Sequence, residues 1–260
     1  MSLRTLAARI RNLGPNGLLD AFVQIGMWFA AYYLYRLVRG VVDGQVATSF
    51  AHARGVVDFE RSIGLFFEPG LQRLSFDHFH WLIDVANVCY VNMHLFGTTT
   101  FLIWLYFARN EAFYFVRNMF MVAMGIALIG YVVFPTAPPR FLPEWGFTDT
   151  VTTMVGSEPA NTANVLYNPY AAIPSMHVAF ALMLGFAGAK LVKNRVLRGA
   201  FYGYPFWVAL VTILTANHFW MDAALGAVAA AAAYSMAVAA ARKRPEAWAF
   251  RRALGSEAAA

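Results

Sequence analysis

Long apolar runs separated by short polar segments dominate the chain. Six of these runs come close to the roughly 20 residues that a helix needs to cross about 30 Å of hydrocarbon. The pattern predicts an all-α fold in which one integral membrane domain, residues 1–260, forms a polytopic bundle of six transmembrane helices. The runs lie near residues 19–39, 79–107, 114–134, 174–193, 201–217 and 219–241.

Residues 44–76, between the first two runs, alternate apolar and polar positions at helical spacing. Such a segment favours one or two amphipathic helices that lie on the outer membrane interface. They are expected to wall a lipid-facing cleft, although simple packing against the bundle explains the pattern equally well. The apolar positions are Val46, Phe50, Val57, Ile63, Phe66, Phe67, Leu71 and Leu74.

A second long segment outside the runs, residues 135–173, is rich in Pro, Asn, Thr and Gly. A connection of this length without obvious regular structure is often functional. It leads directly into Pro174, where the fourth run begins.

Composition agrees with a membrane protein, since the chain is 60% hydrophobic and 13% charged. The net charge of +6 does not indicate nucleic-acid binding, because basic residues of membrane proteins mark the cytoplasmic side. Cys89 is the only cysteine, which excludes a disulfide within the chain and disfavours a cysteine-based metal site. The first run has no small-residue cleavage site after it, so it is interpreted as a permanent span and not as a signal peptide.

Lysine and arginine gather in segments that six spans would place on one side of the membrane. These segments lie before the first run, between the second and third, between the fourth and fifth, and after the last. The positive-inside rule then predicts a cytoplasmic N-terminus at 1–18 and a cytoplasmic basic tail at 242–260. The same rule places the 135–173 loop, His177 and His218 on the extracytoplasmic side.

His218 and Asp222 are four residues apart, at the start of the sixth run. On one helical face, the carboxylate can accept a hydrogen bond from one imidazole nitrogen and leave the other free as a nucleophile. The alternative is that the two side chains simply satisfy one another at a helix end. Ionisable groups at membrane depth are costly and usually functional, which favours the first interpretation.

The tetrapeptide Pro174-Ser175-Met176-His177 opens the fourth run. Pro174 suits the first turn of a helix, and the free backbone N–H groups there form an anion site with the Ser175 hydroxyl. His177 can then give a proton to a leaving oxygen. Alternatively, this is an ordinary helix start whose histidine points into headgroup water.

Arg140 is the only basic residue of the 135–173 loop, and its guanidinium can bind a phosphate through two hydrogen bonds. An arginine that anchors the chain at the headgroups is the alternative. A serine hydrolase is disfavoured because no Gly-x-Ser-x-Gly sequence surrounds Ser175. A zinc site is disfavoured because there is no His-Glu-x-x-His helix.

Taken together, Pro174-Ser175-Met176-His177 and the later His218-x-x-x-Asp222 resemble the second and third signature motifs of the type 2 phosphatidic acid phosphatase superfamily. The resemblance covers about residues 45–235. Three flanking sequences are more similar to the inositol phosphorylceramide synthase-like branch of that superfamily: Pro135-x-Ala137-Pro138-Pro139-Arg140, Asn168-Pro169-Tyr170-Ala171-Ala172 and Asn217-His218.

The resemblance implies roles for these residues. His218 would attack phosphorus, Asp222 would orient it, and His177 would protonate the leaving group. Arg140 would bind the substrate phosphate, and Ser175 and Asn217 are assigned to the same phosphate site. Neither a metal ion nor a cofactor is expected.

The chain departs from the phosphatases of this superfamily at their basic residues. Their first motif carries a Lys and an Arg-Pro, whereas Arg140 is followed here by Phe141. Their Ser-Arg pair before the third motif is absent, and Met176 stands where a glycine is common. These departures favour the transferase-like branch, in which a phosphoester group moves to a second alcohol.

The sequence therefore predicts a lipid phosphatase or phosphotransferase that acts through a phosphohistidine at the extracytoplasmic face of the cell membrane. Expected partners are a lipid phosphate or phospholipid substrate, a polyol or lipid alcohol acceptor, and membrane lipids, but no nucleic acid. The alternative is a non-catalytic transporter of a lipid or anionic small molecule, with the same residues as a proton or anion site. Neither an inverted repeat nor matching broken spans support it.

Four polar residues interrupt the second run. They can line a cleft or contact an acceptor, but hydrogen bonding between neighbouring helices is the favoured role for most of them. They are Asp84, Asn87, Asn92 and His94.

Overall fold

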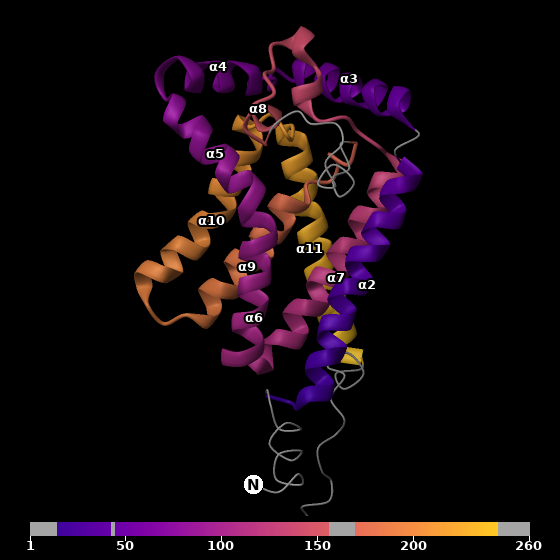
Figure 1. The fold of residues 1–260 in the computed structure, drawn as a ribbon, viewed down its shortest axis with the longest axis vertical. Helices are drawn as coiled ribbons and strands as arrows, with labels where there is room; N and C mark the ends of the chain where they lie inside the picture. The colour runs from indigo at the N-terminus through magenta and orange to yellow at the C-terminus, as the bar shows by residue number, and fades with distance from the viewer. Residues whose placement is uncertain (1–14, 43–44, 156–169, 244–260) are drawn as a thin grey trace, which may run out of the picture.

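The computed structural model describes residues 15–42, 45–155 and 170–243 (Figure 1). In these ranges the chain is helical, with one isolated parallel bridge between Thr136 and Ala171 and no strand. The predicted all-α class is therefore confirmed. The predicted cytoplasmic segments at 1–18 and 242–260 lie almost entirely outside the described residues.

Helical passes along the long axis of the molecule make up its body, and successive passes run in opposite directions (Figure 1). Helix α5 continues through a π-helical turn, η1, into α6. The passes are α2 (Leu18–Val42), α5 (His80–Asn92) with η1 (Met93–Gly97) and α6 (Thr98–Ala108), α7 (Asn110–Val133), α9 (Met176–Leu191), α10 (Arg195–Leu214) and α11 (Trp220–Lys243).

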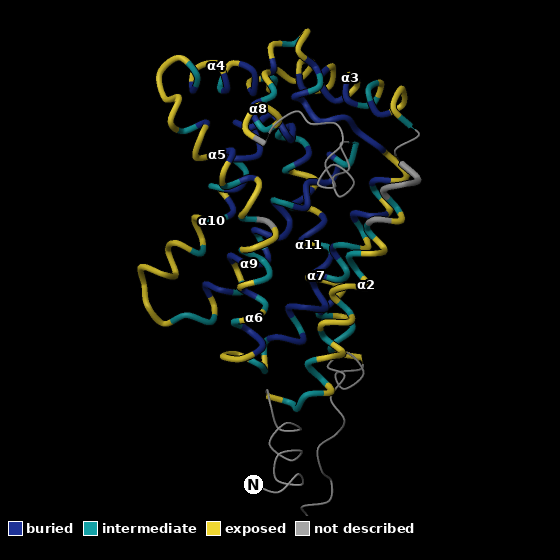
Figure 2. Tube along the Cα trace, in the orientation of Figure 1, coloured by how far each residue is buried: buried dark blue, intermediate teal, exposed yellow. Residues whose placement is uncertain are grey.

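By length and composition, α7, α10 and α11 can each cross a membrane. A fourth candidate is α5 with the segment Leu95–Ala108, a pair that bends by 52°; the bend falls at η1, and π-helical turns are a recognised cause of kinks. Helix α9 is apolar but has 16 residues. Large apolar side chains face outward on these helices, such as Phe206, 80% exposed, and Val228, 63% exposed (Figure 2), as expected of a bundle surrounded by lipid.

Two helices lie across one end of the bundle, α3 (Val46–Ser62) and α4 (Glu68–His78) (Figure 1). The segment expected to lack regular structure contains short helices near them. These are η2 (Pro139–Phe141), η3 (Pro143–Trp145) and α8 (Val151–Val155). Part of the predicted loop, residues 156–169, lies outside the described residues.

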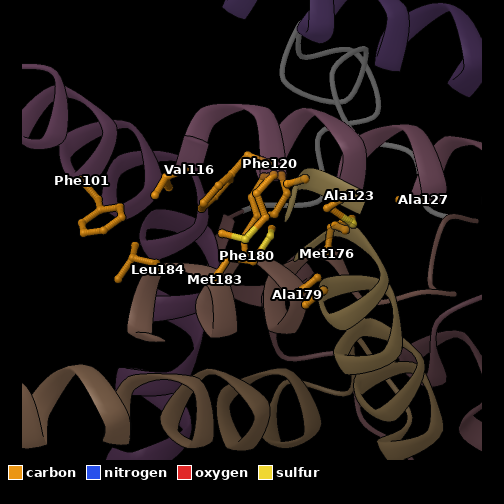
Figure 3. Close-up of a cluster of buried hydrophobic side chains, with 14 of the residues drawn as sticks. Phe101, Val116, Phe120, Ala123, Ala127, Met176, Ala179, Phe180, Met183 and Leu184 are labelled. Carbon is orange, nitrogen blue, oxygen red and sulfur yellow. The ribbon is translucent and has the colours of Figure 1, made fainter. Parts of the chain in front are cut away.

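The main core lies between α7, α9 and α11 (Figure 3). The rings of Phe120 and Phe180 have their centroids 4.7 Å apart. Small residues on α11, among them Ala230 and Ala233, are buried against this cluster. Small side chains let helices approach closely in membranes, which explains the alanine-rich sequence of α11.

A second core fixes α3 to the beginning of α11. Val56 and Val57 of α3 pack in one cluster with Leu142 of the loop and with Phe219, and all four side chains are buried. The transverse helices therefore hold the end of the bundle at which α11 begins.

Candidate active site

His218 lies in the turn that joins α10 to α11. The backbone N–H groups of Asn217 and His218 both donate to the Thr212 carbonyl, at 3.0 and 3.2 Å, and Ala216 adopts a positive φ of 50°. Because α11 begins at Trp220, His218 precedes the helix by two residues. The turn thus holds the His218 side chain, which is buried, beside the start of α11.

Asp222 belongs to the first turn of α11 and is fully buried. Its Oδ2 lies 3.2 Å from Nδ1 of His218 and accepts a hydrogen bond from the Phe219 backbone N–H at 3.0 Å. This second bond satisfies one of the N–H groups that a helix start leaves without an intrahelical partner. The predicted contact between His218 and Asp222 is present, and a helix-capping bond holds the carboxylate in place.

His177 meets His218 from the neighbouring helix. Nε2 of His218 lies 3.4 Å from Nδ1 of His177. On its other side, the His177 ring stacks on Tyr90 of α5, with the centroids 4.5 Å apart and the planes at 24°. The two motifs, 41 residues apart in sequence, therefore form one cluster.

The sequence predicted that Pro174 lies in the first turn of α9, and this prediction is wrong. The helix begins at Met176, and Ser175 is its N-cap, with a hydroxyl that accepts from the Val178 N–H at 3.4 Å. Serine is among the best N-cap residues, so the helix starts after Ser175 and Pro174 precedes it. The Ser175 N–H also donates to the Asp222 carbonyl at 3.0 Å, which joins the two motifs through the backbone.

Arg140 and Asn217 lie beside the histidines. The Arg140 backbone N–H donates to the Ala216 carbonyl at 2.8 Å, and its guanidinium donates to the Asn217 side-chain carbonyl. Its Nε is 3.8 Å from a carboxylate oxygen of Asp149. The Asn217 amide in turn donates to the Thr215 carbonyl at 3.1 Å, so the guanidinium is held in place although it comes from a loop.

Burial dominates the electrostatics of His218. It lowers the pKa of His218 to about 3; a hydrogen bond with the Ala172 backbone opposes this effect, and the positive charge of Arg140 adds to it. At neutral pH the imidazole is therefore uncharged. Its contact with Asp222 assigns the proton to Nδ1 and leaves the Nε2 lone pair available, which is the form that a nucleophile needs.

Sequence reasoning missed two acids, Glu60 and Glu68. Both are fully buried. Glu68 Oε1 accepts from the Trp220 N–H at 3.0 Å, and Glu60 Oε1 accepts from the Met221 N–H at 3.2 Å. A signal was present in the sequence, since Glu60 follows Val56 by four residues and so falls on the apolar stripe of α3.

A narrow recess lies below His177, between α5, α9 and α10. Its walls are mostly apolar, and three hydroxyl groups reach it. It is lined by His177, Tyr90, Phe180, Val208, Cys89, Met93, Ala181 and Val211, with the hydroxyl-bearing Thr98, Tyr204 and Thr212. Among the described residues, no group of three or more His, Cys, Asp or Glu side chains is placed to hold a metal ion.

The polar residues of the second run make local bonds. Asn87 forms a buried pair with the Thr150 side chain at 2.7 Å, Asn92 donates to the Val88 carbonyl at 2.8 Å, and Asp84 lies 3.5 Å from His80. The contacts of Asp84 and Asn92 stay within α5, and that of Asn87 reaches the segment before α8, so none of the three joins neighbouring long helices as expected. The side chain of His94 lies outside the described residues.

Comparison with known proteins gives one match. A family model described as the PAP2 superfamily matches residues 54–236, a range that contains both histidine motifs. Neither a curated protein nor a solved structure matches the chain.

Proposed function

The chain belongs to the PAP2 superfamily, and on this premise we propose that it is a membrane enzyme that cleaves or transfers the phosphate or phospho-headgroup of a lipid through a histidine nucleophile. Members of the superfamily are generally phosphatase-type enzymes that act on lipid phosphates. The observation that carries the proposal is the position of His218, with Asp222 at one ring nitrogen and His177 at the other.

In the first step, Nε2 of His218 attacks phosphorus in line with the leaving oxygen. As the nitrogen–phosphorus bond forms, the bond from phosphorus to that oxygen breaks, and His177 donates a proton to the oxygen. Asp222 keeps the Nδ1–H of His218 oriented and stabilises the imidazolium that forms. The distance of 3.4 Å between Nε2 of His218 and Nδ1 of His177 supports these roles, because it places the proposed acid next to the proposed nucleophile.

In the second step, water or an acceptor hydroxyl attacks the phosphohistidine. Its proton passes to His177, the nitrogen–phosphorus bond breaks, and His218 returns to its neutral form. Attack by water makes the enzyme a phosphatase, whereas attack by an alcohol makes it a phosphotransferase. Positioning and charge stabilisation are the main sources of acceleration in such reactions.

The phosphate oxygens are proposed to bind Arg140, Asn217 and Ser175. Arg140 is supported by its position, because its guanidinium donates to the side chain of Asn217, the residue next to His218. The Ser175 hydroxyl accepts from the backbone and keeps its own proton to donate to phosphate.

Within the superfamily, we assign the chain to the inositol phosphorylceramide synthase-like branch, with an alcohol as acceptor. In the described part of the chain, Arg140 provides a cation beside His218, whereas Arg117 is buried against Gln24 and Asn118. A site with few cations suits a phosphodiester, which carries less charge than a phosphomonoester. The hydroxyl groups of the recess below His177 suit an alcohol.

The proposed topology has six spans, with both termini in the cytoplasm and the site on the extracytoplasmic side. Helix α2, the bent pair of α5 and α6, and α9 would join the three helices that meet the requirements of a span by themselves. Helices α3 and α4 would lie on the outer interface. The single membrane domain would then cover 1–260, with residues 44–76 and 135–173 outside.

An assay of the purified protein in detergent tests the proposal. Lipid phosphates and phosphodiester lipids are offered with and without polyol acceptors, and free phosphate and new phospholipid products are followed together. Product that requires an acceptor supports the transferase branch, and phosphate released without one identifies a phosphatase. No product from any lipid would contradict the proposed function and favour transport.

A further inference from the structure

The first turn of α11 is held by three carboxyl groups. The N–H groups of Phe219, Trp220 and Met221 donate to Asp222, Glu68 and Glu60 in that order, at 3.0, 3.0 and 3.2 Å. A helix start leaves such groups without intrahelical partners and carries a partial positive charge. Carboxyl groups are therefore suited to this position.

Two of the three acids come from outside the bundle. Glu60 lies on α3 and Glu68 at the start of α4, so both transverse helices reach the end of α11. The second oxygen of Glu68 accepts from the Phe67 N–H at 3.0 Å. In the described ranges neither acid forms an ion pair with a lysine or arginine.

Three buried carboxyl groups cannot all be ionised at low cost when no cation is paired with them. Burial, followed by the charge of Glu68 and a hydrogen bond with its side chain, raises the pKa of Glu60 to about 9. The charge of Asp222 also raises it, whereas the bond from the Met221 backbone opposes the change. At neutral pH, Glu60 is therefore protonated.

We propose that Glu60 and Glu68 are positioning residues for the His218–Asp222 pair, because they fix the first turn of α11 and so the direction in which Asp222 presents its carboxylate to His218. The proposal rests on the proposed role of His218. It gives α3 and α4 a positioning role in the reaction.

The pair makes the site sensitive to alkaline pH. The raised pKa means that the native fold favours protonated Glu60, so protonation of Glu60 contributes to the free energy of unfolding. This contribution is complete below the usual pKa of about 4.5 and is lost as pH rises through about 9. Ionised Glu60 would face the charges of Glu68 from α4 and Asp222 from α11. Turnover should therefore fall as pH approaches 9.

The variant Glu60→Gln tests this directly. Its amide keeps an acceptor for the Met221 N–H and a donor for Glu68, but it cannot ionise. The turnover number kcat should stay within roughly 3-fold of the wild-type value at pH 7, and the decline near pH 9 should disappear. Asp58→Asn, which removes an exposed carboxylate from the same helix, should keep the wild-type profile.

Glu60→Leu removes the acceptor as well. We expect roughly a 10- to 100-fold loss of kcat with KM nearly unchanged, since a small misplacement of a catalytic group has effects of this size. If Glu60→Gln shows the same alkaline decline as the wild type, or if Glu60→Leu keeps full kcat, the inference is wrong. Melting temperature against pH is measured on the same proteins. If the wild type turns over no substrate, the proposed function fails. Separately, if Tm falls equally at alkaline pH in the wild type and in Glu60→Gln, the proposed role of Glu60 in fixing the first turn of α11 is wrong.

Discussion

At the scale of single residues, the two histidines have different roles in the proposed mechanism because their surroundings differ. His218 is 4% exposed and is held by Asp222, whereas His177 is partly exposed and stacks on Tyr90. A buried neutral imidazole with a fixed tautomer suits a nucleophile. A partly exposed one that can exchange protons with water suits an acid and base.

Replacing the proposed nucleophile should stop turnover. In His218→Gln we expect a loss of roughly 1,000-fold or more, the scale on which loss of a catalytic triad member acts, with no phosphorylated enzyme. The matched control is His80→Gln, because His80 is an exposed histidine of α5 and should keep full activity. Full activity in His218→Gln, measured by product formation, would refute the mechanism.

Replacing the proposed acid should affect substrates unequally. His177→Gln should slow lipid esters with poor leaving groups by roughly 100-fold or more. A nitrophenyl phosphoester should lose much less, because its leaving oxygen needs no proton. The comparison requires kcat for both substrates in one preparation, and an equal loss on both would argue against His177 as the acid.

The spacing of His218 and Asp222 led to the correct prediction of their contact, although His218 reaches Asp222 from the turn before α11 and not from one face of the helix. The bond from Arg140 to Asn217 could not be predicted in this way, since it joins a loop to a turn 77 residues later. The hydrogen bonds from α11 to Glu60 and Glu68 could not be predicted from the sequence either. Their partners are backbone N–H groups, which every residue but proline carries and no sequence pattern marks.

At the scale of elements, two helices approach the turn before α9 through glycines. A Cβ on Gly226 of α11 would lie 2.3 Å from the Ser175 carbonyl oxygen, and one on Gly130 of α7 would lie 2.7 Å from Cδ of Pro174. This turn carries Ser175 and leads into His177. The two glycines therefore let α7 and α11 fix the position of the second motif.

An alanine at Gly226 should disturb this packing. We expect Gly226→Ala to lower stability by about 1–3 kcal/mol, as overpacking does, and to reduce kcat, because the turn and Asp222 must move apart. Gly125→Ala on α7 is the control, since no atom lies within 4 Å of the added Cβ. Thermal melting in detergent distinguishes the two variants, and equal Tm values would contradict the close contact.

Apolar runs located the long helices to within a few residues, because burial in hydrocarbon requires continuous apolar sequence whatever the tertiary contacts. The run 114–134, for example, corresponds to α7 at Asn110–Val133. The π-helical bend in the run 79–107 was not predicted, since hydropathy does not report backbone geometry. The short helices at 139–155 were also missed, because tertiary packing stabilises this segment, as where Leu142 and Phe147 pack in one cluster with α3.

At the scale of the whole molecule, the two ends of the bundle are built differently. Helices α3 and α4 lie at one end (Figure 1). Their acids Glu60 and Glu68 bond to the start of α11, beside Asp222, the histidines and Arg140. At the other end, Asp20 of α2 accepts hydrogen bonds from Tyr106 and Tyr114, at 2.9 and 2.8 Å. These bonds tie the first helix to the bundle, far from the chemistry.

Cysteine labelling tests the proposed orientation. In a Cys89→Ser background, Asp58→Cys on α3 should react with a membrane-impermeant maleimide in intact cells. Arg195→Cys, at the start of α10, should react only after permeabilisation, because the positive-inside rule places it in the cytoplasm. Both positions are exposed in the structure. A reversed labelling pattern would therefore show that the orientation in the membrane is opposite to the proposed one.

The cap on α11 also has a consequence for biogenesis. Glu68 and Glu60 bond to residues 152 and 161 positions later in the chain. A nascent chain that has inserted every earlier helix therefore still carries two acids whose partners have not been synthesised. The proposed active site can therefore become complete only after the first turn of α11 has been synthesised.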